Sequence, residues 1–108
     1  MEVIDPLEFA STITDAYTNK PVGQLNDHVI RLSIMTLPYD WHYHPNSDET
    51  FIGSAGILVV ETEKAAVELS AGMAITISKG ILHRTRPKGE RSVNLTIEHA
   101  AIETVFVY

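Results

Sequence analysis

Residues 41–49, which read WHYHPNSDE, combine a short alternating strand pattern with a strong turn signal. On a strand, residues two apart point to the same face, so His42 and His44 project together. The turn formers at 45–48 end this piece, and extended character resumes at Glu49. We expect the two pieces to lie antiparallel around the turn, with Glu49 beside the two imidazoles. Two imidazoles and a carboxylate are a common ligand set for a divalent ion. Two strand histidines that bind nothing are the alternative.

The strongest helix signal lies near the N-terminus. Asp5 can cap the helix, Pro6 fits its first position, and Glu8 lies three residues beyond the cap. These residues predict a short helix over about residues 6–14. Residues 18–23 then contain Thr, Asn, Lys, Pro and Gly, which predict a turn and the end of this segment.

The rest of the chain consists of short apolar or alternating runs separated by Gly, Pro and Asn. These runs predict strands at residues 28–36, 41–44, 49–52, 57–60, 66–69, 73–77, 81–85, 93–97 and 103–107. The runs at 57–60 and 66–69 read as a hairpin. Many short strands with almost no helix favour an all-β sandwich or barrel.

Composition and length limit the possible functions. The 108 residues suffice for a single domain, 1–108, whose barrel we expect to cover about residues 23–108. A formal charge of −6 disfavours nucleic acid and anionic membranes as partners. The absence of cysteine leaves His, Asp and Glu as the strong metal ligands. With no secretory signal or apolar run of membrane-spanning length, we expect a cytoplasmic protein.

The spacing of polar residues and glycines over a longer stretch of the chain adds His83 as a fourth candidate ligand. The sequence reads His42-x-His44, four residues, Glu49, six residues, Gly56; then Gly72, five residues, Ser78-x-Gly80, two residues, His83. Over residues 38–87 this spacing resembles, in order and register, the two signature motifs of the cupin superfamily of RmlC-like jelly rolls. In overall size the chain is similar to the small single-domain bacterial cupins grouped as mannose-6-phosphate-isomerase-like.

This resemblance implies an all-β fold, the cupin double-stranded β-helix or jelly-roll barrel, with a short N-terminal helix. It also implies one divalent metal ion, which could be Fe, Mn, Ni or Zn. The implied metal ligands are His42, His44, Glu49 and His83. Two positions depart from the family pattern, because Ser78 stands where a proline is usual and Pro87 where an asparagine is usual. Neither departure removes a ligand, but both affect the turn and the barrel mouth.

Two classes of function fit such a site. Three histidines and a carboxylate leave one or two positions open on a six-coordinate metal, which suits a metal-dependent enzyme acting on a small polar molecule. A dioxygenase, an isomerase and a lyase are all compatible with this set, and no residue identifies the substrate. A non-catalytic small-molecule or metal-binding module is the alternative. We expect no unligated acid or base in the pocket, which favours that alternative. Apolar termini and exposed strand edges also predict a homodimer.

Other polar residues receive separate predictions. Strand alternation turns Arg84 and Arg86 outward if His83 faces the interior, although an anion site is the alternative. His28 and His99 lie outside both motifs and are expected to be ordinary surface or strand histidines. The turn residues 46–48 could orient the ligating imidazoles, or be present because turns favour them. Phe51 shares parity with Glu49 and could line the pocket.

Overall fold

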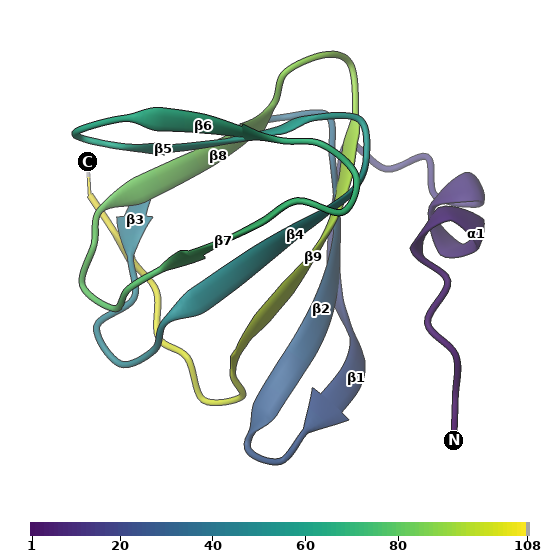
Figure 1. Cartoon of the computed structure of the whole chain (residues 1–108), viewed down its shortest axis with the longest axis horizontal. Helices are drawn as coiled ribbons and strands as arrows, with labels where there is room; N and C mark the ends of the chain where they lie inside the picture. The colour runs from purple at the N-terminus through teal and green to yellow at the C-terminus, as the bar shows by residue number, and fades with distance from the viewer. Residues whose placement is uncertain (108) are drawn as a thin grey trace.

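The computed structural model describes residues 1–107 and has two five-stranded antiparallel sheets that face each other, with one short helix outside them (Figure 1). The strand orders are β1-β2-β9-β4-β7 and β10-β3-β8-β5-β6. The elements are α1 Pro6–Ser11, β1 Tyr17–Leu25, β2 His28–Met35, β3 Tyr39–Tyr43, β4 Glu49–Ala55, β5 Leu58–Thr62, β6 Ala66–Leu69, β7 Ala74–Ile77, β8 His83–Pro87, β9 Ser92–His99 and β10 Val105–Phe106. The predicted hairpin is confirmed as the β5–β6 pair.

The helix α1 begins as predicted but ends earlier, at Ser11. The Asp5 carboxylate accepts the Glu8 amide at 3.1 Å, and Pro6 occupies the first turn. At the other end, the Arg91 side chain donates to the Ala10 carbonyl at 2.7 Å and also reaches the Ile13 carbonyl. These bonds satisfy carbonyls that a longer helix would have used, and the β-branched residues 12–14 do not favour extending it.

The strand β1 corrects the prediction of a turn at residues 18–23. Tyr17–Leu25 pairs antiparallel with β2, and the register shifts between Pro21 and Gly23. Proline is tolerated here because β1 is the edge strand of its sheet and the irregularity falls next to the proline. The sheet therefore begins at Tyr17, upstream of the expected start near residue 23.

The strands β3 and β4 correct a second prediction, because they are not paired with each other. β3 lies between β10 and β8, whereas β4 lies between β9 and β7 in the opposite sheet. The turn at 45–48 therefore carries the chain from one sheet to the other. His42 and Glu49 still approach each other, because the inner faces of both sheets point into the same interior.

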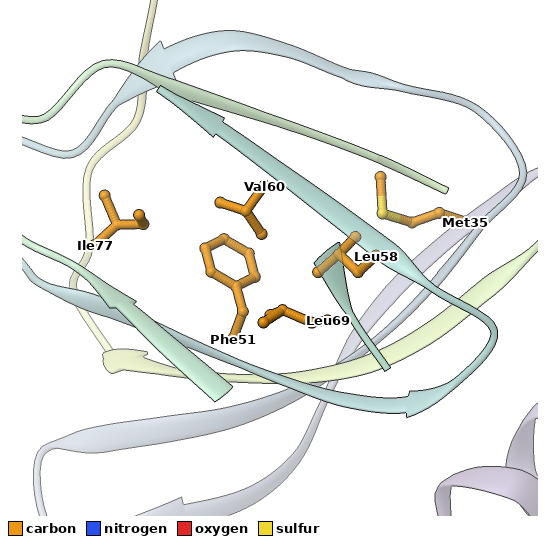
Figure 2. Packing of buried hydrophobic residues seen from close by; sticks show 6 residues of the cluster. All are labelled: Met35, Phe51, Leu58, Val60, Leu69 and Ile77. Carbon is orange, nitrogen blue, oxygen red and sulfur yellow. The ribbon is translucent and has the colours of Figure 1, made fainter. Parts of the chain in front are cut away.

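Apolar side chains fill two separate regions. One cluster lies between the sheets and consists of Met35, Phe51, Leu58, Val60, Leu69 and Ile77, with Phe51 near its centre (Figure 2). The other lies under the helix, where Ala10 packs on Leu32, Ile34 and Val93. Each such burial stabilises the fold by about 1.5–3 kcal/mol for a large side chain. The first cluster occupies only part of the space between the sheets, and polar residues line the remainder.

Candidate metal centre

Four buried side chains converge at the polar part of the interior. His42 lies on β3 and His44 just after it, Glu49 begins β4, and His83 begins β8. One ligand atom from each lies within 4.8 Å of all the others. Glu49 Oε1 is 3.2 Å from His44 Nε2 and 3.4 Å from His83 Nε2. Because His42 and His83 are register partners of β3 and β8, the sheet itself sets their spacing.

Backbone carbonyls orient all three imidazoles. Their Nδ1 atoms lie 2.6, 2.9 and 2.8 Å from the carbonyl oxygens of Asp40, Glu103 and Ile81, respectively. A carbonyl can only accept, so each Nδ1 carries the proton and each Nε2 keeps its lone pair for the centre. Among the described residues, the buried His44 Nε2 has no partner in hydrogen-bond geometry. An inward lone pair without a donor fits a metal ion.

The protonation states suit metal binding at neutral pH. Burial lowers the pKa of His42 to about 4, so this imidazole is neutral. Burial opposes ionisation of Glu49, but its interactions with the adjacent His44 and His83 outweigh burial and lower the pKa of Glu49 to about 2. Burial also opposes protonation of His44, but its interaction with Glu49 raises the pKa of His44. A metal that binds His44 therefore competes with a proton.

A cavity of about 410 Å³ opens from the cluster into the space between the sheets. Its walls come mainly from β1, β2, β3, β4 and β9. The lining residues beyond the ligands include Tyr17, Asn19, Arg31, Ser33, Tyr39, Phe51, Thr85, Asn94, Thr96 and Glu98. Phe51 lines the cavity as predicted and packs edge-on against His83 at 6.1 Å. Tyr39 also lines it, and burial raises its pKa to about 12.

Glu98 corrects the prediction that the pocket has no unligated acid or base. This residue is only 6% exposed and is the β9 register partner of Glu49. Burial, together with repulsion from Glu49, raises the pKa of Glu98 to about 7. The signal was present in β9, whose polar residues alternate with Val93, Leu95 and Ile97. The sequence pattern predicts only a strand there, whereas in the structure the polar set faces the cavity and is mostly buried.

The turn residue Asn46 acts on the site indirectly. Its amide contacts no imidazole; Nδ2 donates to the Ala101 carbonyl at 3.0 Å, and Oδ1 accepts the Glu103 amide at 2.9 Å. The Glu103 carbonyl in turn holds His44 Nδ1. Asn46 therefore fixes the segment that orients His44.

The turn that contains Ser78 docks on the neighbouring turn at 45–48. The Lys79 amide donates to Asp48 Oδ1 at 2.8 Å, and the Gly80 amide donates to the His44 carbonyl at 2.8 Å. Pro87, the second departure from the family pattern, ends β8 opposite Leu58. With both departures present, the four candidate ligands still converge.

The remaining charged candidates lie away from the centre. Arg84 and Arg86 point outward as predicted and both bind Glu61, at 2.9 and 2.8 Å. His28 and His99 are surface residues that flank Asp27, at 2.8 and 3.4 Å. Neither group contributes to the cavity lining.

Two facing antiparallel sheets around a polar cavity, with three histidines and one glutamate at its base, define a cupin-type barrel. The profile described as Cupin domain matches residues 34–105, and the chain belongs to this family. The predicted all-β cupin fold is therefore confirmed. In the part of the chain that the structure describes, no helix is long and apolar enough to cross a membrane.

Particular relatives agree with this assignment. The chain is 40% identical over 102 residues to the uncharacterized protein YdbB of Bacillus subtilis (strain 168), covering 94% of this chain and 89% of the relative. It is 26% identical to a cupin-2 domain containing protein from Shewanella frigidimarina, with a TM-score of 0.81 over 90% of this chain and 94% of that one. The DMSP lyase DddQ from Ruegeria pomeroyi shares the fold alone, at 20% identity and a TM-score of 0.74 over 87% of this chain and 53% of that one.

Proposed function

We propose that this cupin binds one divalent metal ion through His42, His44, Glu49 and His83 and acts on a small polar molecule in the adjoining cavity. The observation that carries the proposal is the buried convergence of four ligand atoms within 4.8 Å, with backbone carbonyls holding the three Nδ1 atoms. Iron, manganese, nickel and zinc all accept such nitrogen and oxygen ligands. When bound, the ion supplies Lewis acidity at the base of the cavity.

Glu98 favours an enzyme over a passive binding module. Its carboxyl is not one of the four proposed ligands and lines the same cavity, and in the metal-free protein burial raises its pKa to about 7, so it can hold or release a proton near neutral pH. Isomerases and lyases generally require such a proton transfer, so this residue favours these two reaction types over oxygen chemistry. The membership of a mannose-6-phosphate-isomerase-like group stays a prediction.

Elemental analysis tests the metal proposal. Protein purified without a chelator should carry about one divalent ion per chain, and His44→Ala should remove most of it. The surface variant His28→Ala serves as the matched control, because it removes an imidazole far from the cavity lining. Metal-free wild-type protein, or equal occupancy in His44→Ala, would contradict the proposal. A metal-loaded protein that binds small molecules without converting them would instead be the non-catalytic module.

We also propose that the partner in solution is a second copy of the chain. Val105 and Phe106 form β10, a two-residue edge strand with exposed apolar side chains, and Val107 beside them is also exposed. Exposed apolar edges of this kind are more stable when covered. Light scattering should give a dimer mass that Val105→Asp reduces to that of a monomer. Leu25→Asp, at an exposed position of the β1–β2 hairpin, should leave it unchanged. A monomeric wild-type protein at micromolar concentration refutes the dimer.

A further inference from the structure

Arg31 is the only Lys or Arg among the residues found to line the cavity in the described chain. It lies on β2, and its side chain is 32% exposed. Its Nη1 donates to Asn19 Oδ1 at 3.3 Å, and its Nε lies 4.0 Å from Glu98 Oε1. By contrast, Arg84 makes two hydrogen bonds to Glu61 outside the barrel.

The hydrogen-bonding capacity of Arg31 is therefore largely unused. A guanidinium carries five N–H donors in a planar fork that matches a carboxylate or phosphate. One long hydrogen bond and one ion pair at 4.0 Å satisfy little of this capacity. The guanidinium lies on the cavity wall, where an anionic ligand can reach it.

Asn94 provides a second, independent observation on the same wall. It lines the cavity, is only 1% exposed, and its Oδ1 has no hydrogen-bond partner among the described residues. Asn94 is the register partner of Ser33, while Arg31 pairs with Thr96 two positions along β9. A buried acceptor without a donor is costly, so its presence beside a cavity points to a ligand hydroxyl or N–H.

The charge of the loaded site also selects an anion. The charged side chains found in the cavity lining are Arg31, Glu49 and Glu98. A divalent ion and one guanidinium supply three positive charges against at most two negative ones. The cavity is then net positive even when both carboxylates are ionised, although the chain as a whole has a formal charge of −6. A cavity of 410 Å³ is at the small end of the range for ligand sites, which suits a compact metabolite.

We propose that Arg31 and Asn94 form an anchoring subsite for a small hydroxy-carboxylate. Arg31 binds the carboxylate, and Asn94 Oδ1 accepts the hydroxyl hydrogen. The subsite defines the substrate class of the enzyme proposed above. It rests on that proposed function only for the part of the ligand that would lie next to the metal ion. Arg31 and Asn94 can make these two contacts without the ion, but lactate should then bind more weakly, because the metal-free cavity is no longer net positive.

The test uses four small probes that separate these groups. Lactate carries a carboxylate and a hydroxyl, propionate has only the carboxylate, and lactamide keeps the hydroxyl but has no carboxylate. Inorganic phosphate is an anion that has no carboxylate. Binding is followed by NMR through the Asn94 side-chain amide and the Thr96 backbone amide, in zinc-loaded and in chelator-treated protein. We expect lactate to bind more tightly than propionate and propionate more tightly than lactamide.

Variants assign the effect to the two residues. Arg31→Gln should weaken lactate binding about tenfold or more, and Arg31→Lys should restore part of it. Asn94→Leu should remove the preference for lactate over propionate. Arg86→Gln is the matched control and should bind lactate like the wild type, because Arg86 binds Glu61 outside the cavity. Thermal unfolding of each variant identifies any that fails to fold. If Arg31→Gln does not fold, the lactate affinity of Arg31→Lys is compared with that of the wild type instead.

Each outcome is decisive. The subsite is refuted if no probe binds, if lactamide binds as well as lactate, or if Arg31→Gln binds lactate unchanged. Phosphate binding more tightly than lactate overturns the carboxylate assignment. If the protein does not load zinc but its lactate binding still depends on Arg31, the metal-dependent function is refuted and the subsite is supported.

Discussion

Replacing Glu98 by Gln should stabilise the metal-free protein at alkaline pH and leave it unchanged in acid. The pKa of Glu98 is raised from 4.5 to about 7, first by burial and then by repulsion from Glu49. The folded protein therefore keeps a proton that the unfolded chain loses between these values. Where the folded state binds more protons, stability falls as pH rises, so the wild type loses stability between about pH 4.5 and 7.

The size of this effect follows from the shift. A change from 4.5 to about 7 corresponds to roughly 3 kcal/mol. The residue lines a cavity that water can enter, and screening reduces the expected penalty to about 1–2 kcal/mol. Glutamine is neutral at every pH and can still accept the Thr96 hydroxyl hydrogen bond, which is 3.2 Å long. The variant should therefore escape the penalty without losing that contact.

Urea unfolding measures the effect directly. The single tryptophan, Trp41, reports unfolding by fluorescence in buffers containing a chelator. Wild type and Glu98→Gln should have equal free energies of unfolding near pH 4, and near pH 8 that of the variant should be higher by about 1–2 kcal/mol. Glu90→Gln, at an exposed position, controls for the loss of one negative charge. A difference that does not change with pH, or a variant that is less stable near pH 8, would refute the reasoning.

Three further predictions concern the turns and the metal. Asn46→Ala should weaken metal binding about tenfold, measured by chelator competition, because it frees the backbone that holds His44. Asn46→Asp keeps the acceptor and should lose less metal affinity. Equal losses of affinity in the two variants would contradict this role. Gly56→Ala should cost roughly 2–5 kcal/mol in urea unfolding, because its φ is 64° and a Cβ would lie 2.2 Å from the Arg91 carbonyl oxygen. Gly89→Ala, with no atom within 4 Å of the new Cβ, is its control, and similar costs for both would refute the argument. Adding metal at about a hundredfold its Kd should stabilise the folded state by roughly 2.7 kcal/mol, seen as a higher Tm, and an unchanged Tm counts against a preformed site.

Most of the strands could be predicted because their signals are local. The hairpin β5–β6 follows from two β-branched or apolar runs with a polar turn between them, and the structure pairs Leu58 with Leu69 as that pattern requires. The strand β1 could not be predicted in the same way. Its Pro21 and Gly23 read as a turn, and only its position at a sheet edge makes a proline and an irregular register acceptable.

The residues of the site also differ in how far the sequence predicts them. Alternation alone places His42 and His44 together, and motif spacing adds Glu49 and His83, all four of which the fold brings within reach of one ion. Glu98 lies outside the motifs, so the sequence does not predict its place in the site. The alternation in β9 indicates that Asn94, Thr96 and Glu98 share one face, but polar residues on an alternating strand normally face water, so the pattern does not show that this face points inward.

The sequence by itself determined most of the strands and the placement of His42 beside His44, because side-chain alternation and turn chemistry act over a few residues. The other two proposed ligands, Glu49 and His83, came from the motif spacing that resembles the cupin family. Only the tertiary structure decided which face of β9 and β2 points inward. The helix α1 covers Leu32 and Val93 on the outer face, and this burial turns Arg31, Asn94 and Glu98 toward the cavity. It also decided that β3 and β4 belong to opposite sheets, since strand pairing depends on the whole barrel closing around its interior.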